Sequence, residues 1–286
     1  MPSLIDLRRR IRSVKNTQQV TKAMKMVSAA KLRRAQERVL AARPYAQMFR
    51  QMLADVAAAS GSADWLESNP LLARRSEERI TLVFLTADRG LAGGFNSNLI
   101  RAAQDFLFQH AGARVELYTL GRKGRDFYRK RGGKIIGERT GISQAADYKE
   151  ASAIAQEVSA RFAQDETDAV YLLYNEFKSV LSQKVTLTRV LPIDVPTETS
   201  GADYIYEQPP DRLLGALLPR YVEIAVYQAM LESAAAEHAA RMTAMESATS
   251  NAGEVIEKLT LYMNRVRQAS ITKELIEVVS GAAALT

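Results

Sequence analysis

Residues 3–58 decide the fold, and their sequence is SLIDLRRRIRSVKNTQQVTKAMKMVSAAKLRRAQERVLAARPYAQMFRQMLADVAA. Residues three and four apart lie on one side of a helix, and this stretch keeps such a spacing without a break. Twelve of the sixteen spaced positions are apolar, as in the seam of a coiled coil. The sixteen positions are Leu4, Leu7, Ile11, Val14, Gln18, Thr21, Lys25, Ser28, Leu32, Ala35, Val39, Ala42, Ala46, Phe49, Leu53 and Val56. Ser3 and Asp6 have the spacing of a capping box, which predicts a helix start there.

A polar gap interrupts this seam. Its four polar positions are consecutive, from Gln18 to Ser28. Apolar residues stand beside them at Val20, Met24 and Val27. We therefore expect the helix to turn another face inward over these turns.

A second long helix is predicted over residues 211–280, after two prolines and before Gly281. Its own 3,4 seam runs from Ile224 to Ala269 and is apolar except at His238 and Arg241. These two residues lie one turn apart. Two interpretations stay open for them: a polar layer that fixes register or reaches a partner, or side chains that extend to the helix surface.

The lengths of the two helices set the architecture. At about 1.5 Å per residue they measure roughly 85 Å and 105 Å. A compact chain of this size has a radius of gyration of about 19 Å, so the helices are expected to project as an antiparallel rod.

The segment between the helices alternates strand and helix. Strands are predicted at 80–85, 114–120, 168–176 and 185–190, and helices at 97–109, 122–131 and 148–163. The predicted fold class is therefore α/β: a long antiparallel two-helix coiled coil with a doubly wound, Rossmann-like domain between its helices. The expected division is 1–58 for the N-terminal helix, 59–79 for a linker, 80–208 for the α/β domain and 209–286 for the C-terminal helix.

Composition and charge exclude several classes of protein. The 286 residues include no cysteine, which excludes disulfides, thiolate metal sites and cysteine nucleophiles. No apolar run is long enough for a membrane-spanning helix, and the N-terminus does not resemble a secretory signal. Residues 1–50 hold 13 Lys and Arg against two acids, so the positive charge is concentrated there. Its partner should be nucleic acid, anionic lipid or an acidic protein surface.

The candidate chemistry is sparse. The turn DRGLAGGFN, residues 88–96, follows the first strand, but its glycines have neither the dinucleotide-binding nor the Walker spacing. We expect a structural turn there, with nucleotide binding as the alternative. The C-terminal residues Leu275, Ile276 and Val279 belong to a stretch that is apolar around most of its circumference, so we expect another protein to enclose this tip in an apolar sleeve.

Three stretches resemble the γ subunit of F-type ATP synthases: KAMKMVSAAK (22–31), the DRGLAGGFN turn, and NRVRQASITKELIE (264–277). The resemblance covers the whole chain and implies a bacterial central-stalk rotor without a catalytic site, metal or cofactor. Its implied partners are the α and β subunits as a hexamer, the ε subunit and the c-ring. Membrane contact is expected only through the c-ring, at the cytoplasmic face of the bacterial inner membrane.

The resemblance also implies site residues. Met24, Lys25, Arg267, Gln268 and Thr272 match positions where the shaft contacts β. A basic coiled-coil protein that binds nucleic acid is the alternative function, and a nucleotide-dependent enzyme using the glycine turn is another. Salt-sensitive retention on DNA would favour the former.

Overall fold

The computed structural model describes residues 3–60, 69–141, 146–195 and 204–283. Two compact units emerge from it: a terminal unit of Met1–Ser28 with Met242–Thr286, and a central unit of Ala29–Arg241. Each is described by itself. The helices are α1 (Leu4–Ser60), the short 3-10 helix η1 (Pro70–Leu72), α3 (Phe95–Gln109), α4 (Arg122–Arg129), α5 (Tyr148–Ala163) and α6 (Pro210–Ala283). The strands are β1 (Arg79–Leu85), β2 (Arg114–Leu120), β3 (Ile135–Arg139), β4 (Ala169–Phe177) and β5 (Gln183–Leu191).

The first long helix starts where the capping box predicts. The backbone N–H of Asp6 donates a hydrogen bond of 3.1 Å to the hydroxyl of Ser3, which satisfies one of the free N–H groups at the helix start. The first long helix lies within two residues of its predicted bounds, whereas the second begins one residue early and ends three residues late, past the predicted stop at Gly281. The α/β fold class with long helices at both ends of the chain is therefore confirmed.

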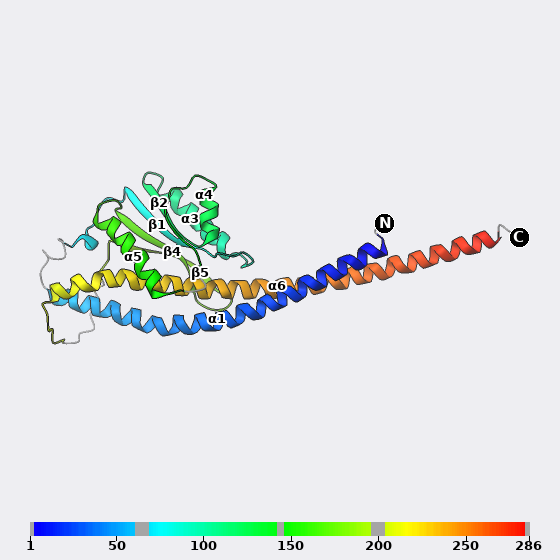
Figure 1. Cartoon of the computed structure of the whole chain (residues 1–286), viewed down its shortest axis with the longest axis horizontal. Helices are drawn as coiled ribbons and strands as arrows, with labels where there is room; N and C mark the ends of the chain where they lie inside the picture. Colours follow the sequence, from blue (N-terminus) through cyan, green and yellow to red (C-terminus); the bar gives the residue numbers. More distant parts are fainter. Residues whose placement is uncertain (1–2, 61–68, 142–145, 196–203, 284–286) are drawn as a thin grey trace. The chain divides into compact units, whose positions relative to one another are not determined.

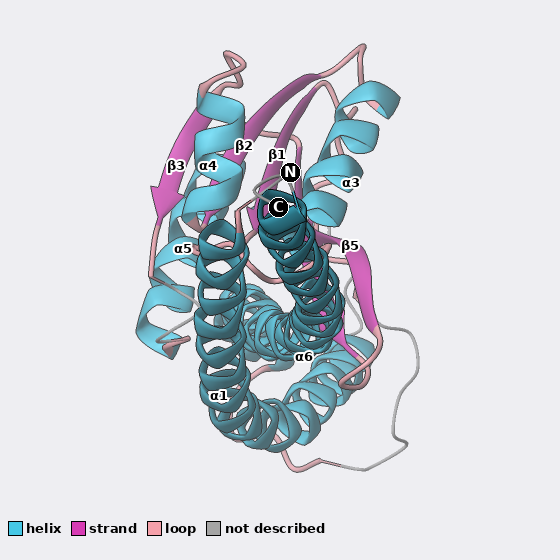
Figure 2. Ribbon diagram, turned by 90° about the vertical axis from the view of Figure 1, so that its right-hand side faces the viewer, coloured by secondary structure: helices cyan, strands magenta, loops and turns pink. Residues whose placement is uncertain are grey.

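The central unit contains a five-stranded sheet in the order β3-β2-β1-β4-β5 (Figures 1 and 2). The first four strands of that order are parallel, and β5 pairs antiparallel with β4. The central strand β1 is buried on both faces, as its near-continuous apolar sequence predicts. The sequence reading missed β3, a half-buried edge strand of five residues.

Helices cover both faces of the sheet (Figure 2). Gly124 of α4 lies against the ring of Phe84, and Phe106 of α3 packs against Tyr171, which shares that face, with the two rings tilted. On the opposite face the hydroxyl of Tyr118 donates to Glu157 of α5 at 2.7 Å. Glu223 of α6 accepts hydrogen bonds from Tyr148 and Ser152 of α5 on that side, so the N-terminal part of α6 belongs to the same layer.

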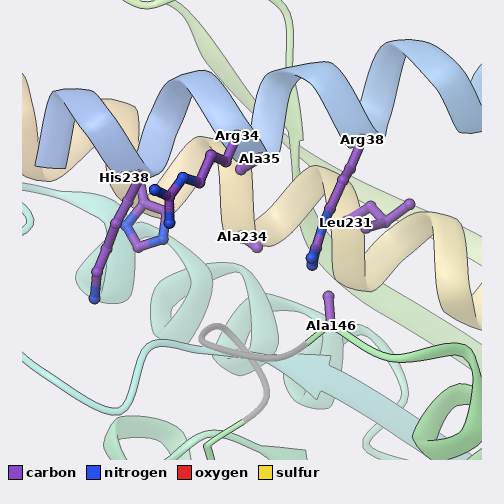
Figure 3. Close-up of a pocket in the computed structure, with 8 residues that line it drawn as sticks. Arg34, Ala35, Arg38, Ala146, Leu231, Ala234 and His238 are labelled. Carbon is purple, nitrogen blue, oxygen red and sulfur yellow. The ribbon is translucent and has the colours of Figure 1, made fainter.

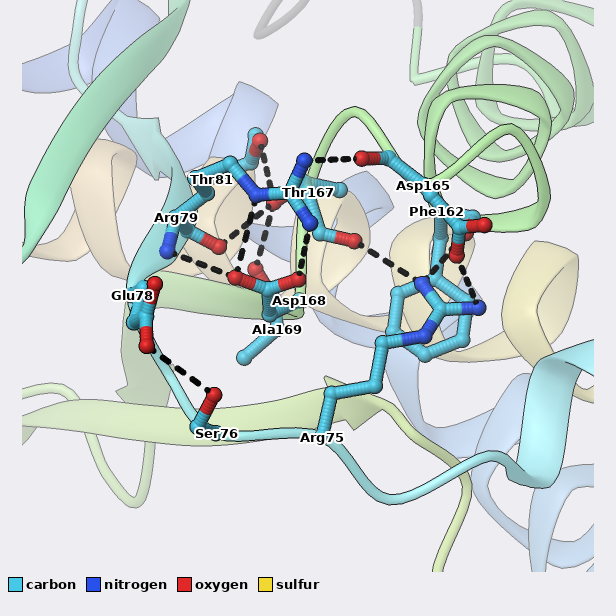
Figure 4. A network of polar contacts seen from close by, with 10 residues as sticks. All are labelled: Arg75, Ser76, Glu78, Arg79, Thr81, Phe162, Asp165, Thr167, Asp168 and Ala169. Atoms are coloured by element: carbon cyan, nitrogen blue, oxygen red, sulfur yellow. Dashed lines mark hydrogen bonds and ion pairs between the residues drawn. The ribbon is translucent and has the colours of Figure 1, made fainter.

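A network of hydrogen bonds and ion pairs joins the start of β1 to the residues just before β4 (Figure 4). The carboxylate of Asp168 accepts hydrogen bonds from the backbone N–H of Arg79 at 2.8 Å and from its guanidinium at 2.7 Å. The guanidinium of Arg75 donates to the carbonyl of Phe162 at 2.8 Å and lies over its ring. These bonds satisfy backbone groups where the parallel strands begin.

Burial along α6 changes within the central unit. All nine residues from Leu231 to Ala239 are buried, so the helix is enclosed on every side there. This follows because α1 packs on one side of α6 and the sheet on another, with Arg43 of α1, Glu232 of α6 and Phe177 of β4 in direct contact. Such an enclosed helix differs from the two-helix seam that the sequence predicts.

Candidate partner-binding site

The polar gap of α1 forms a polar layer inside the terminal unit. The hydroxyl oxygens of Thr21 and Thr249 lie 2.7 Å apart, and the side-chain amide of Gln18 donates to the carbonyl of Thr249 at 3.3 Å. Lys25 forms an ion pair with Glu246. The polar seam positions of α1 therefore meet polar groups of α6.

The predicted turn of α1 onto another face is wrong. Thr21 and Ser28 are buried, whereas Val20 and Val27 are 58% and 56% exposed. The physical reason is that Thr21 and Gln18 find hydrogen-bond partners across the seam, so the helix has no need to replace them by apolar neighbours. Met24 is half-buried.

The C-terminal candidates all lie on the exposed part of α6. Arg267, Gln268 and Thr272 are exposed, and the hydroxyl of Thr272 donates to the carbonyl of Gln268 at 2.9 Å within the helix. Within the terminal unit, α6 continues past the start of α1 (Figure 1). Each residue from Ile271 to Ser280 is exposed, so this surface is free in the isolated chain.

The apolar tip is a dense exposed patch. Leu275 and Ile276 are each 60% exposed, and Val279 is exposed as well. Neighbouring Ile271 and Val278 are also exposed. Large contiguous apolar surface of this kind marks an interaction site in a soluble protein.

The structure places His238 and Arg241 inside the central unit. Both are buried, so the interpretation that they extend to the helix surface is wrong. The guanidinium of Arg241 pairs with Glu237 at 2.7 Å and donates to the carbonyls of Arg89 and Gly90, both at 3.4 Å. Arg241 thus fastens α6 to the glycine-rich turn after β1.

The environment of His238 disfavours its charged form. Burial lowers the pKa of the imidazole, and the positive charges of Arg241 and Lys31 lower it further, to about 4. The ring is therefore neutral at physiological pH. Its Nδ1 atom is buried and has no hydrogen-bond partner among the described residues.

A buried ion pair was missed by sequence reasoning. Glu232 accepts hydrogen bonds from the Nε and Nη2 atoms of Arg43 at 2.9 and 3.0 Å, and from the backbone N–H of Phe177 at 3.0 Å. Arg43 also donates to the carbonyl of Phe177 at 2.7 Å. The sequence feature that could have indicated this pair is the acidic Glu232 within a run of small and apolar residues on α6. The pair joins α1, α6 and β4.

The glycines beside the strands have packing roles. A Cβ atom at Gly121, whose φ is +97°, would lie 2.0 Å from the carbonyl oxygen of Thr86. At Gly124 it would lie 2.5 Å from the ring of Phe84. Close approach of the Thr86 backbone to Gly121 and of the Phe84 ring to Gly124 thus accounts for both glycines without a bound phosphate.

Among the described residues, no three His, Cys, Asp or Glu side chains gather as metal ligands would. In the part of the chain that the structure describes, no helix has the length and apolarity to cross a bilayer.

Comparisons with known proteins now fix the family. The family model described as ATP synthase matches residues 3–285. The ATP synthase gamma chain of Solibacter usitatus is 62% identical over 99% of both chains, and that of Pelotomaculum thermopropionicum is 50% identical over the full length of both. The fold and these matches define the chain as a subunit of an ATP synthase. Within that class, it belongs to the γ chain family.

Solved structures agree with this assignment. A chain of the central stalk and c-ring structure of the Tetrahymena thermophila mitochondrial ATP synthase superposes with a TM-score of 0.60 at 26% identity, covering 80% of this chain and 99% of that one. A chain of the Euglena gracilis mitochondrial ATP synthase has the same fold, with a TM-score of 0.69 at 20% identity over 99% and 94% of the two chains. No comparison supports the nucleic-acid-binding alternative.

Proposed function

We propose that this chain is the central-stalk rotor of an F-type ATP synthase, turning inside a hexamer of α and β subunits. The observation that carries the proposal is the end-to-end match to γ chains, reaching 62% identity over 99% of the chain. The superposed Tetrahymena chain, which comes from a central stalk and c-ring, supports the same role. Ion flow would turn the c-ring, and the rotor would transmit that torque to the β subunits.

The parts of the chain divide this work. Residues 1–58 and 209–286 would form the shaft, 59–79 a linker, and 80–208 the foot that binds the ε subunit and the c-ring. His238 and Arg241 would form a polar layer that fixes how α6 seats. Their burial, and the bonds from Arg241 to the glycine turn, support that role.

The shaft contacts to β would come from two exposed regions. Arg267, Gln268 and Thr272 are exposed on α6, and Met24 with Lys25 is half-buried on α1. The apolar tip at Leu275, Ile276 and Val279 would be enclosed by the hexamer in an apolar sleeve. Enclosure would remove exposed apolar area from water, at about 25 cal/mol per Å².

The chain itself would be non-catalytic and use no cofactor. The hydrogen bonds from Arg241 to the carbonyls of Arg89 and Gly90 support this, since they give the glycine-rich turn a structural role. ATP would be made on β. The subunit would lie peripherally at the cytoplasmic face of the bacterial inner membrane, held there through the c-ring.

Two engineered disulfides test the rotor. The chain has no cysteine, so introduced thiols are its only ones. Replacing Thr21 and Thr249 by cysteine places two sulfurs where hydroxyls now lie 2.7 Å apart, joining the two helices to each other. A second complex carries Gln268→Cys with a cysteine on the facing β subunit.

The rotor proposal expects opposite results from the two bonds. The bond within the shaft should leave steady ATP turnover largely intact, because both helices turn together. The bond to β should stop turnover until a reductant is added. Full turnover with a verified Gln268 bond to β would contradict rotation and leave a static stalk.

A further inference from the structure

A small pocket opens in the central unit between α1 and α6. Its volume is about 190 Å³, smaller than the 300–1,000 Å³ typical of sites for drug-sized ligands. Figure 3 shows the side chains of Arg34 and Arg38 extending from α1 into this region, Arg38 toward Ala146. The residues that line the pocket are Lys31, Arg34, Ala35, Arg38, Ala146, Leu231, Ala234 and His238.

The charged groups of this pocket all have one sign. Lys31, Arg34 and Arg38 follow one another at spacings of three and four, so one side of α1 presents all three. Within the described ranges, none of the three forms an ion pair. Glu237, which precedes His238 in the sequence, is engaged by Arg241 at 2.7 Å. The three cations are exposed residues that line the pocket without an ion-pair partner among the described residues.

His238 adds a second, independent observation. Its side chain is buried, with the residue 7% exposed, and it lines the same pocket from α6. Its Nδ1 atom lacks a hydrogen-bond partner among the described residues. The ring therefore lies beside the three cations, and its titration is sensitive to charge bound in the pocket.

We propose that this pocket binds a phosphate-type oxyanion, held by Lys31, Arg34 and Arg38 with the imidazole of His238 at its inner wall. Guanidinium groups bind tetrahedral oxyanions through paired N–H donors, and an ammonium adds a compact charge. The imidazole of His238 belongs to the pocket lining, but because its Nδ1 atom is fully buried the ring is assigned no hydrogen bond to the anion. The inference goes beyond the proposed rotation and does not depend on it.

The dimensions of the pocket favour a small anion over an acidic peptide. The inner wall is a buried ring, and the volume suits a single oxyanion with water. Two sources share this chemistry: free phosphate, and the terminal phosphate of a nucleotide. The test therefore has an arm for each.

The two histidines of the chain provide the readout. In full-length protein labelled on histidine, NMR follows the ring resonances of His238 and His110 while sodium phosphate is added at constant ionic strength. His238 should shift and saturate. His110, at the end of α3 and outside the pocket lining, should stay unchanged. ADP without magnesium is titrated in parallel, and a shift with it as well would extend the site to nucleotide phosphates.

Bound anion should also change the titration of His238. The groups around its ring are Lys31, Arg34 and Arg38 of α1 and Glu237 and Arg241 of α6. A dianion among these cations favours the imidazolium, so the pKa of His238 should rise from its lowered value. A phosphate-induced shift with no rise in that pKa would place the anion elsewhere and overturn the proposal.

Matched variants distinguish anion binding in this pocket from attraction to the overall positive charge of α1. Arg34→Gln and Arg38→Gln should each weaken phosphate binding at least tenfold. Arg33→Gln removes the same charge from the neighbouring position, which does not line the pocket, and should change affinity less than twofold. Equal loss in all three variants, an equal shift with sodium chloride, or a response only to an acidic peptide would each overturn the proposal.

Discussion

Glu232 is the side chain whose loss should cost the central unit most. It is 2% exposed and holds both the guanidinium of Arg43 and the backbone N–H of Phe177. We expect Glu232→Ala to lower the free energy of unfolding by about 3 kcal/mol, because it leaves a half-buried cation and a buried N–H without a partner. Urea unfolding of the purified chain measures this.

The control for this prediction is an exposed ion pair on the same helix as Arg43. Arg33 and Glu37 form such a pair at 3.3 Å, with both side chains mostly exposed. Glu37→Ala should change the free energy of unfolding by less than about 0.5 kcal/mol. Similar losses for Glu232→Ala and Glu37→Ala would show that the buried pair adds nothing special.

Asp168 should make stability depend on acidity. Hydrogen bonds from Arg79 hold the pKa of this carboxyl below its ordinary value of 3.8. A folded-state pKa below the unfolded one means that the carboxylate stabilises the fold above about pH 4, and that this contribution disappears as pH falls through the folded value. Asp168→Asn should therefore lower the urea midpoint at pH 7 and flatten its decline below pH 4.

Asp105 offers the comparison for that pH series. It is exposed on α3, and Asp105→Asn should leave both the midpoint at pH 7 and its acid decline as they are in the parent chain. An unchanged acid decline in Asp168→Asn would mean that other carboxyls govern it.

At the scale of elements, the sequence predicts long periodic helices and buried strands well. Predicted strand and helix bounds lie within two residues of the observed ones for nearly every element found. The edge strand β3 escaped because Gly137, Glu138 and Arg139 give it neither an apolar run nor a clean alternation. An edge strand is only partly buried, so its sequence does not need a regular alternation of apolar and polar residues.

The candidate site was less predictable for a different reason. Spacing shows which residues share a helix face, but it does not show what covers that face. The spacing places His238 and Arg241 on the seam of α6. It does not predict the contact of Arg241 with Arg89, because these residues lie 152 positions apart in the sequence. The prediction that Val20 and Val27 turn inward failed because it considered only apolar character. It did not include the hydrogen bond that Thr21 makes across the seam, which keeps Thr21 buried and leaves both valines exposed.

The polar layer of the terminal unit should behave as a coupled pair. One hydroxyl of Thr21 and Thr249 donates across the 2.7 Å gap, while each also lies within reach of a carbonyl of its own helix. Thr21→Val should cost about 1 kcal/mol. Adding Thr249→Val should cost less than a second independent loss, with a coupling of about 0.5–1 kcal/mol. Thermal unfolding followed by helical circular dichroism measures the cycle.

Thr17 gives this cycle its reference. Its hydroxyl donates only to Ser13 of the same helix and is exposed. Thr17→Val should change the unfolding midpoint little, and should add independently to Thr249→Val. Strict additivity between Thr21→Val and Thr249→Val would show that the two hydroxyls do not depend on each other.

At the scale of the whole molecule, a rotor must contact β without being held by it. Apolar and weakly polar contacts suit that need, since they are broken and remade at each step without a strong ion pair. Met24 is half-buried on α1, beside Lys25, whose ammonium is already paired with Glu246. A second ammonium at position 24 would compete with Lys25 for Glu246.

Met24→Lys should therefore impair coupling more than folding. The new charge either draws Glu246 from Lys25 or binds an acid on β, and in the second case each step of rotation must break an added attraction of about 1–3 kcal/mol. We expect the complex to assemble and hydrolyse ATP, while ATP synthesis per ion translocated falls several-fold. Met26→Lys, at a position 60% exposed two residues on, is the matched control and should couple normally. Equal losses of assembly and coupling in Met24→Lys would instead show that Met24 is a packing residue. A misfolded shaft prevents assembly of the complex, so its loss of coupling would follow from the loss of assembly.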